Sequence, residues 1–433
     1  MFIMESFIDE LKWRGLIHDS TPGIEDFLST KKRSAYIGFD PTSDSLHIGS
    51  LVPILLLAHF QKYGHKPIAL IGGATGMIGD PSGKSSERVL LDESTLRNNE
   101  LSIKNQLSKF LSFDSNKSNK AEILNNYDWM KNITFIDFIR DIGKHITVNY
   151  MMSKESVKNR ISSESGAGMS FTEFTYQMVQ GYDFLFLSRE YDCKFQMGGS
   201  DQWGNITTGM ELLRRIDGAK GFSLTCPLIT KSDGSKFGKS EGMNIWLDKT
   251  KTSSFKFYQY WLNTSDEDAK NYIKIFTFLE RKKITSLIKE HEKEPHSRVL
   301  QKTLAAQVTE LVHGTKELEN AIKASQILFS KNFVKEINQI DENLFLEIFE
   351  GVPGCKISID NFNINIIDFL VEKSGFLNSN SEARRSLDEK SIYINKVKVS
   401  KDYMVSQSDL LKNKYIVINK GKKKTFMVEI LKI

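Results

Sequence analysis

The first half of the chain alternates between short apolar segments and longer segments with helical periodicity. Residues 36–39 and 67–71 each predict a strand, and residues 47–62 between them predict a buried helix. Residues 96–113 predict a further helix, because their apolar side chains recur with the period of a helix face. Strands that alternate with helices favour an α/β fold, in which helices cover both faces of a parallel sheet. Such sheets bind ligands beyond the carboxyl ends of their strands.

The second half of the chain has a different pattern. Residues 253–330 contain almost no proline or glycine and are rich in helix formers, which predicts a small helical domain. Residues 331–354 end in a Val-Pro-Gly sequence and predict a linker. From residue 359 on, the helix-like residues 366–373 and the alternating residues 392–395 predict a small α+β domain.

Composition and charge narrow the classes of function. The chain has 433 residues, of which 40% are hydrophobic and 26% charged, as in ordinary globular proteins. Its net charge of +5 is unevenly spread: residues 356–433 carry 15 Lys and Arg against 9 Asp and Glu, a net charge of +6. The C-terminal segment therefore predicts a surface that attracts phosphate backbones. The alternative is a solvated, lysine-rich surface without a partner.

Cysteine usage and hydropathy point to the cytoplasm. The three cysteines, Cys193, Cys226 and Cys355, form no close pair, which argues against a disulfide framework and fits a reducing compartment. Because there is no CxxC pair or Cys/His cluster, we expect no protein-bound metal site. Residues 1–17 lack the long apolar core of a signal peptide, and the longest apolar run, residues 51–58, is too short to span a bilayer. We therefore expect a cytoplasmic protein without a membrane partner.

A glycine-rich segment, residues 72–85, invites a phosphate-loop interpretation that its spacing contradicts. A Walker A loop requires a glycine five positions before Gly83, where Ile78 stands. The dinucleotide fingerprint fails as well, because the glycines of this segment have a different spacing. The segment can still bring backbone close to a ligand, or it can be a tight turn without one.

Two other segments are better candidates for phosphate chemistry. Residues 40–50 follow a strand and open a helix, so His47 and Gly49 would lie where free N–H groups bind anions. Residues 231–240 contain Lys236 and Lys239, flexible point charges suited to a departing pyrophosphate. Read singly, the first segment could be a helix cap and the second an exposed turn.

Together, the two segments resemble the paired signatures of class I aminoacyl-tRNA synthetases, usually written HIGH and KMSKS. They read His47-Ile48-Gly49-Ser50 and Lys236-Phe237-Gly238-Lys239-Ser240. Essentially the whole chain resembles the bacterial-type tyrosyl-tRNA synthetases in particular. The matching stretches are residues 36–42, 72–81, 125–129, 170–184, 196–206 and 227–239.

The resemblance implies a tyrosine–tRNA ligase, which activates L-tyrosine with ATP and Mg²⁺ to tyrosyl-adenylate and transfers the tyrosine to tRNA(Tyr). The implied tyrosine-binding residues are Tyr36 and Asp183 at the phenol hydroxyl, Asp80, Tyr176 and Gln180 at the ammonium group, and Gln196 and Gln202 near the carboxylate. The implied ATP-binding residues are Gly38, Asp40, Gly49, Ser50, Gly199, Asp201 and Lys239. The implied catalytic residues are Thr42, His47, Lys236 and Lys239.

The resemblance also implies the organisation of the chain. Residues 1–240 would form a Rossmann-like catalytic domain, residues 241–330 a helical tRNA-contacting domain, residues 331–358 a linker, and residues 359–433 an S4-like RNA-binding domain. In the last of these, Arg384 and Arg385 would grip RNA phosphates. A homodimer is implied as well, with Phe171 as a candidate interface residue.

The sequence departs from the family pattern in places, and other functions stay open as alternatives. Ser50 replaces the second histidine of HIGH, and Ile37 replaces a cysteine often found there. The competing functions are a tryptophanyl ligase, a non-catalytic RNA-binding protein and a nucleotidyltransferase that acts without tRNA. The pair Tyr36 and Asp183 fits a phenol better than an indole, the intact His47 argues against a non-catalytic protein, and the basic C-terminal segment argues for RNA.

Overall fold

The computed structural model describes residues 6–82, 90–161, 168–235, 237–240, 243–358, 363–421 and 424–431, with the backbone alone at 239 and 240. The chain forms two compact units. The first comprises Met1–Thr252 and Asn263–Val312, and the second comprises Ser253–Leu262 and His313–Ile433. Each unit has its own sheet and its own hydrophobic core.

The first unit is built on a six-stranded sheet with the order β1-β6-β5-β2-β3-β4. Its strands are β1 (Asp19–Ser20), β2 (Ser34–Phe39), β3 (Lys66–Ile71), β4 (Glu122–Asn125), β5 (Phe195–Gly199) and β6 (Phe222–Cys226). All neighbouring pairs are parallel except the short edge strand β1, which is antiparallel to β6. The order reverses where β2 lies beside β5, with Tyr36 opposite Gln196. The predicted α/β fold with a parallel sheet is confirmed.

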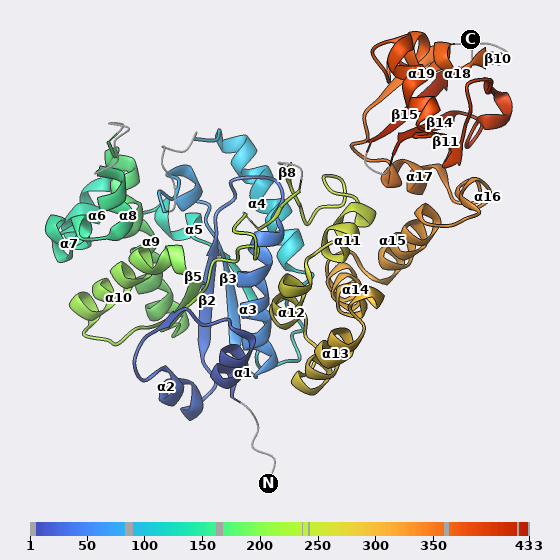
Figure 1. The fold of residues 1–433 in the computed structure, drawn as a ribbon. Coiled ribbons are helices and arrows are strands. Elements are labelled where there is room, and N and C mark those ends of the chain that lie inside the picture. Colours follow the sequence, from blue (N-terminus) through green and yellow to red (C-terminus); the bar gives the residue numbers. More distant parts are fainter. Residues whose placement is uncertain are drawn as a thin grey trace. The chain divides into compact units, whose positions relative to one another are not determined.

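Helices cover both faces of this sheet (Figure 1). Helix α3 (Leu51–Lys62) follows a 3-10 turn at Ile48–Ser50 and packs on β2, β3 and β5. On the other face lie α10 (Trp203–Asp217), which packs on β5 and β6, and α9 (Phe171–Tyr191), which packs along α10. The other α-helices before α9 are α1 (Phe7–Arg14), α2 (Ile24–Thr30), α4 (Glu93–Leu107), α5 (Tyr127–Met130), α6 (Phe135–Asp141), α7 (Val148–Met152) and α8 (Glu155–Ile161).

Helix α4 differs from the prediction of a helix over residues 96–113. It begins earlier, because the Asp92 side chain accepts a hydrogen bond from the Thr95 amide and caps the helix. It ends at Leu107, six residues before the predicted end. Beyond it, the Gln61 side-chain amide binds both the N–H and the C=O of Ser112, which takes these groups out of a helical ladder. Apolar spacing alone carries no sign of this contact.

The helical prediction for residues 253–330 is matched by five helices that the two units share. The first unit contains α12 (Asp266–Ile275), α13 (Arg281–Lys293) and nearly all of α14 (Val299–His313). The second contains α11 (Ser254–Leu262) and α15 (Thr315–Leu328). Among the described residues, no helix is both long and apolar enough to cross a membrane.

The segment predicted as a linker contains two short helices, α16 (Phe333–Ile337) and α17 (Glu342–Ile348). Their side chains Phe333, Ile337 and Phe345 are buried in a cluster that also contains Tyr415 and Val417. Burial of this apolar surface explains why the segment folds in place of an extended connection.

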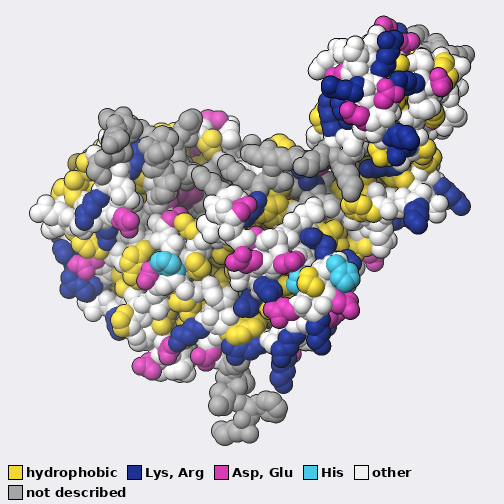
Figure 2. Space-filling view, in the orientation of Figure 1, with side chains coloured by type: hydrophobic (Ala, Val, Ile, Leu, Met, Phe, Trp, Pro, Cys, Tyr) yellow, Lys and Arg dark blue, Asp and Glu magenta, His cyan; other side chains and the backbone are white. Residues whose placement is uncertain are grey.

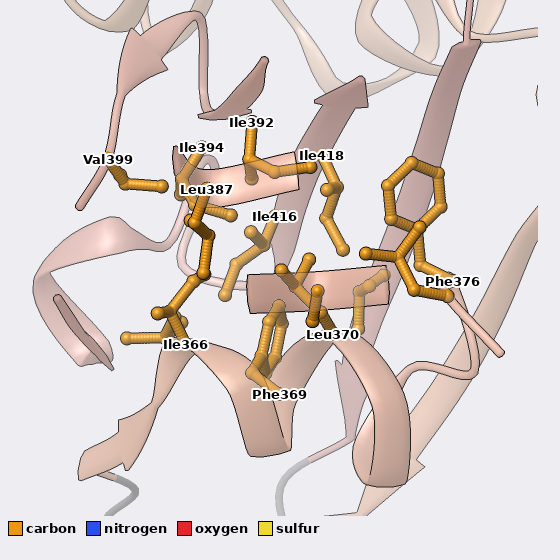
Figure 3. Close-up of a cluster of buried hydrophobic side chains, with 14 of the residues drawn as sticks. Ile366, Phe369, Leu370, Phe376, Leu387, Ile392, Ile394, Val399, Ile416 and Ile418 are labelled. Atoms are coloured by element: carbon orange, nitrogen blue, oxygen red, sulfur yellow. The ribbon is translucent and has the colours of Figure 1, made fainter. Parts of the chain in front are cut away.

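The second unit ends in a small α+β domain. Its five-stranded sheet has the order β12-β11-β14-β15-β9, from β9 (Gly354–Ser358), β11 (Ile392–Ile394), β12 (Val397–Lys398), β14 (Tyr415–Lys420) and β15 (Lys424–Leu431). Strands β10 (Asn363–Asn365) and β13 (Met404–Ser406) pair separately. Helix α18 (Ile366–Asp368) continues into a π-helical turn, Phe369–Lys373, and α19 (Asn380–Asp388) follows. Figure 3 shows how Phe369, Leu370 and Leu387 of these helical segments meet Ile392 and Ile416 of the sheet.

Candidate active site

A cavity of about 870 Å³ lies at the carboxyl ends of the central strands of the first unit. It opens where the strand order reverses between β2 and β5, the usual ligand position in a sheet of this kind. The predicted site residues that line it are Tyr36, Gly38, Asp40, Thr42, His47, Gly49, Ser50, Asp80, Tyr176, Gln180, Asp183, Gln196, Gly199, Asp201 and Gln202. Lys236 and the side chain of Lys239 lie outside the described residues.

Helix α9 presents three of these residues from one face. Tyr176, Gln180 and Asp183 are four and three residues apart, so their side chains project to the same side of the helix. The helix begins where the Ser170 hydroxyl accepts a hydrogen bond from the Glu173 amide. A single helix thus supplies one wall of the cavity.

Asp183 and Tyr36 are two buried polar side chains that line this cavity, and each is 1% exposed. The indole N–H of Trp129 donates to Oδ1 of Asp183 at 2.9 Å, and the Asn126 amide donates to Oδ2 at 2.9 Å. Burial raises the pKa of Asp183 to about 7, while these two hydrogen bonds act in the opposite direction. Burial and the neighbouring Asp183 charge also raise the pKa of Tyr36.

Three buried polar atoms on the cavity lining have no hydrogen-bond partner among the described residues. They are the Tyr36 hydroxyl, Oε1 of Gln180 and Oε1 of Gln196. Buried polar groups in folded proteins nearly always have partners, and leaving one unpaired costs about 1–3 kcal/mol. Their convergence on one cavity indicates a polar ligand with donors and acceptors at these positions.

Asp40, which directly follows β2, is linked to Asp183 through a chain of hydrogen bonds. Its carboxylate accepts hydrogen bonds from the Tyr176 hydroxyl at 2.8 Å and from the Thr75 hydroxyl at 2.7 Å. Asn126 donates to Thr75 as well as to Asp183, so it links the two carboxylates. Burial, followed by the Asp40 charge, raises the pKa of Tyr176. The resemblance placed Tyr176 near the ammonium group, and the structure adds its bond to Asp40.

Asp80 is held by the turn that follows β5. The Gln202 amide donates to its carboxylate at 2.7 Å, and the Ser82 backbone N–H donates at 2.9 Å. Asp80 is itself buried. Its carboxylate is therefore held in place on the cavity wall, where it offers negative charge.

At the mouth of the cavity, His47 caps the start of the helix that leads into α3. Its Nδ1 accepts a hydrogen bond from the Gly49 N–H at 3.0 Å. A neutral imidazole that accepts at Nδ1 carries its proton on Nε2, which makes Nε2 a donor. A Cβ at Gly49 would lie 2.6 Å from the His47 ring. Glycine at this position therefore makes room for the imidazole itself.

Sequence reasoning missed the residues that hold Asp183. Neither Asn126 nor Trp129 has a predicted role, although both lie in a stretch that matches the family. Thr75, in the matching stretch 72–81, likewise has no predicted role. The available signal is position: residues 126–129 directly follow β4, at the carboxyl edge of the sheet where ligands bind.

The second unit carries the two arginines predicted to bind RNA. Arg384 and Arg385 are exposed on α19, whose buried Ala383 and Leu387 pack against the sheet. Figure 2 shows Lys and Arg side chains gathered on the visible face of this domain. The positive charge counted in the sequence is thus displayed at its surface.

Comparisons with known proteins identify the class of enzyme to which the chain belongs. Residues 28–330 match the family of class I tRNA synthetases for tryptophan and tyrosine, and residues 345–428 match the C-terminal domain of tyrosine–tRNA ligases. The chain is 59% identical over 431 residues to the tyrosine–tRNA ligase of Flavobacterium psychrophilum, covering 99% of this chain and 100% of the relative. The Bacteroides fragilis enzyme is 54% identical over 426 residues, 98% of this chain and 99% of the relative.

A solved structure agrees with these relatives. A C-terminally truncated mitochondrial tyrosyl-tRNA synthetase of Aspergillus nidulans has a TM-score of 0.67 and 32% identity, over 75% of this chain and 94% of that one. The chain belongs to the class I aminoacyl-tRNA synthetases and, within them, to the tyrosyl-tRNA synthetase family.

Proposed function

We propose that this chain is a tyrosine–tRNA ligase. It joins L-tyrosine to ATP to form tyrosyl-adenylate and pyrophosphate, then transfers the tyrosine to the 3′ end of tRNA(Tyr). The observation that carries the choice of amino acid is the buried pair of Tyr36 and Asp183 in a cavity that Asp40, His47 and Gly199 also line. A charging assay with labelled amino acids tests it: tyrosine should be esterified to bulk tRNA, and charging with tryptophan would support the related tryptophanyl ligase instead.

Asp183 and Tyr36 would recognise the phenol of tyrosine through hydrogen bonds. Each oxygen of Asp183 already accepts one bond, from Trp129 or Asn126, and retains a second acceptor position. The substrate hydroxyl can donate to that position and accept from the Tyr36 hydroxyl, which has no other partner among the described residues. An indole N–H could donate but could not accept.

The remaining polar groups of the cavity suit the amino-acid backbone. Asp80, Tyr176 and Gln180 would hold the ammonium group, since Asp80 offers negative charge and Gln180 an unpaired buried carbonyl oxygen. Gln196 and Gln202 would orient the carboxylate. We assign these roles from the geometry together with the family pattern.

ATP would lie toward the mouth of the cavity. Gly38, Gly49, Ser50, Gly199 and Asp201 would line the adenosine, beside Asp40. Thr42 and His47 would contact the phosphates, where the Nε2–H of His47 is a suitable donor. Lys236 and Lys239 would hold the pyrophosphate as it leaves, on the strength of the signature alone.

The chemistry requires little from the protein beyond position and charge. A carboxylate oxygen of tyrosine, already ionised at neutral pH, attacks the α-phosphorus, and the bond to pyrophosphate breaks. No general base is needed for this step. The tRNA hydroxyl then attacks the activated carbonyl, and AMP leaves. Mg²⁺ would enter as the counter-ion of ATP, held chiefly by phosphate oxygens.

We propose that tRNA binds through the second unit. Arg384 and Arg385 are exposed on one helix of a domain whose family model belongs to tyrosine–tRNA ligases. The attraction between arginine and phosphate does not depend on base sequence. The two arginines would therefore bind the RNA backbone and leave the choice of tRNA to other contacts. The four-part domain division inferred from the sequence stays a prediction.

We also propose a homodimer through an apolar surface of the first unit. The surface consists of the exposed residues Phe135, Ile136, Ile139, Val148, Met152, Ile161 and Phe171 on helices α6 to α9. Phe138 of α6, Tyr150 of α7 and Phe174 of α9 pack on one shared core, which places these helices around it. The buried ion pair of Arg160 and Glu173 at 2.7 Å ties α8 to α9. Apolar patches of this kind mark interfaces between proteins.

We place the enzyme in the cytoplasm, where its tRNA substrate would be found. Two buried free thiols, Cys193 and Cys226, support a reducing compartment. Burial raises the pKa of each thiol to about 12, so both remain protonated at neutral pH.

A further inference from the structure

The two signature segments are joined through the backbone of one residue. The Ile48 N–H donates to the Ile245 carbonyl at 3.0 Å, and the Ile245 N–H donates to the Gly238 carbonyl at 3.0 Å. Gly238 has φ of +88° and lies against the helix start, because a Cβ there would be 3.5 Å from Ile48. The loop of residues 231–240, called here the lysine loop, thus ends directly beside the phosphate end of the cavity.

The beginning of the lysine loop is attached to α12. The Ser232 N–H donates to the Asp268 carboxylate at 2.9 Å, and the Tyr272 hydroxyl donates to the Thr230 carbonyl at 3.2 Å. Asp268 and Tyr272 are four residues apart and therefore share one face of the helix. Phe276 lies a further four residues on and continues this face.

Phe237, within the loop, packs onto the same face of α12. Its ring stacks on Phe276 with centroids 5.2 Å apart and planes 14° apart, and it meets Tyr272 edge-on at 5.2 Å. Phe276 is fully buried, whereas Phe237 is half-buried and also lines the main cavity. One aromatic side chain therefore connects the cavity wall to the helix.

Helix α12 is itself held by hydrogen bonds at its ends. The guanidinium of Arg14, which is buried and paired with Glu10, donates to the carbonyls of Thr277 at 2.7 Å and Leu279 at 2.8 Å, just beyond the end of α12. At its other end, the Ser265 hydroxyl caps the helix. The C-terminal end of α12 is thus held by Arg14 of α1, and its N-terminus is closed by its own cap.

We propose that Phe237 is a positioning residue for the activation step. Its ring, seated against Phe276 and Tyr272, fixes the backbone of the lysine loop at Gly238, beside the helix start that His47 caps. Lys236 and Lys239 are close neighbours of Phe237 in the chain. The site of ATP, and not the site of tyrosine, therefore depends on this aromatic contact. The inference rests on the proposed function and concerns the same cavity.

The test is steady-state ATP–pyrophosphate exchange by the full chain, with tyrosine and ATP varied separately. Phe237→Leu should lower kcat/KM for ATP about tenfold and leave KM for tyrosine within about twofold. Phe237→Met, an unbranched side chain that can still pack on the rings, should restore most of the activity. Phe278→Leu is the matched control: Phe278 faces His59 just past α12, and this change should leave both kinetic constants near wild type.

A double-mutant cycle identifies the partner. If Phe237 acts through Phe276, Phe276→Leu added to Phe237→Leu should lower kcat/KM for ATP less than the two single effects combined. Unchanged ATP kinetics in Phe237→Leu, an equal rise in KM for tyrosine, or strict additivity in the cycle would overturn the inference. A wild-type chain without tyrosine-dependent exchange would instead overturn the proposed function, so the two failures are distinguishable.

Discussion

The indole N–H of Trp129 donates a 2.9 Å hydrogen bond to Oδ1 of Asp183, a residue 54 positions away along the chain. The contact connects the segment after β4 to the middle of α9. Together with Asn126 on the other oxygen, it sets the direction in which the Asp183 carboxylate faces the cavity. The proposed recognition of the phenol by Asp183 thus also depends on Trp129 and Asn126, which orient its carboxylate.

At a pH above the Asp183 pKa of about 7, where the carboxylate is charged, we expect Trp129→Phe to weaken tyrosine binding roughly ten- to a hundredfold, since a hydrogen bond to a charged group contributes about 1.5–3 kcal/mol. The remaining ring can still stack on Phe186, so the core should be kept. The measurement is KM for tyrosine in exchange, with KM for ATP as the internal reference. Trp203→Phe, which removes an indole outside the cavity lining, is the control. Equal effects of the two changes would show that the Asp183 contact is not what matters.

The raised pKa of Asp183 predicts a specific pH dependence of stability. The fold holds this carboxyl neutral up to about pH 7, whereas the unfolded chain ionises it near 3.8. Its contribution is therefore fully present below pH 4 and is lost as the pH rises through 7. Relative to Asp183→Asn, wild type should lose about 2–3 kcal/mol of unfolding free energy between pH 5 and pH 8. Denaturant unfolding at both pH values measures the difference, and a pH-independent difference would refute the assignment.

Replacing Arg384 and Arg385 by alanine should separate the two half-reactions. Exchange should remain near wild type, because both arginines belong to a unit that contains none of the residues lining the cavity. Binding of tRNA should weaken, and the slope of log affinity against log salt should become shallower by about one to two. Filter binding over a salt series measures this. Lys331→Ala with Lys335→Ala removes equal charge from the same unit away from α19, and an identical loss there would indicate a general charge effect.

Phe171→Asp should disrupt the proposed dimer. The side chain is 66% exposed, so the monomer should tolerate the change, while a carboxylate buried at an apolar interface is costly. Sedimentation equilibrium should show a dimer for wild type and a much larger monomer fraction for the variant. Leu101→Asp, at a comparably exposed position on α4, is the control. A monomeric wild type would contradict the proposal.

Parts of this site follow from sequence because they depend on local spacing. Tyr176, Gln180 and Asp183 share a face of any helix that contains them, and His47 with Gly49 lies at a strand-to-helix turn. Other parts depend on contacts between distant segments. The bond from Trp129 to Asp183, the backbone bridge at Ile245 and the aromatic contact of Phe237 join residues whose types suit a core or a turn equally well. The same holds for α16 and α17, whose burial depends on Tyr415 and Val417 from the later sheet.

The most direct test of the account is the ratio of kcat/KM for tyrosine to that for phenylalanine in ATP–pyrophosphate exchange. Phenylalanine would leave the buried Asp183 and Tyr36 groups without their partner, at a cost of about 1–3 kcal/mol for each. The account predicts that phenylalanine is at least about a hundredfold poorer as a substrate, and that Tyr36→Phe reduces the ratio. Comparable values for tyrosine and phenylalanine in the wild-type enzyme would contradict it.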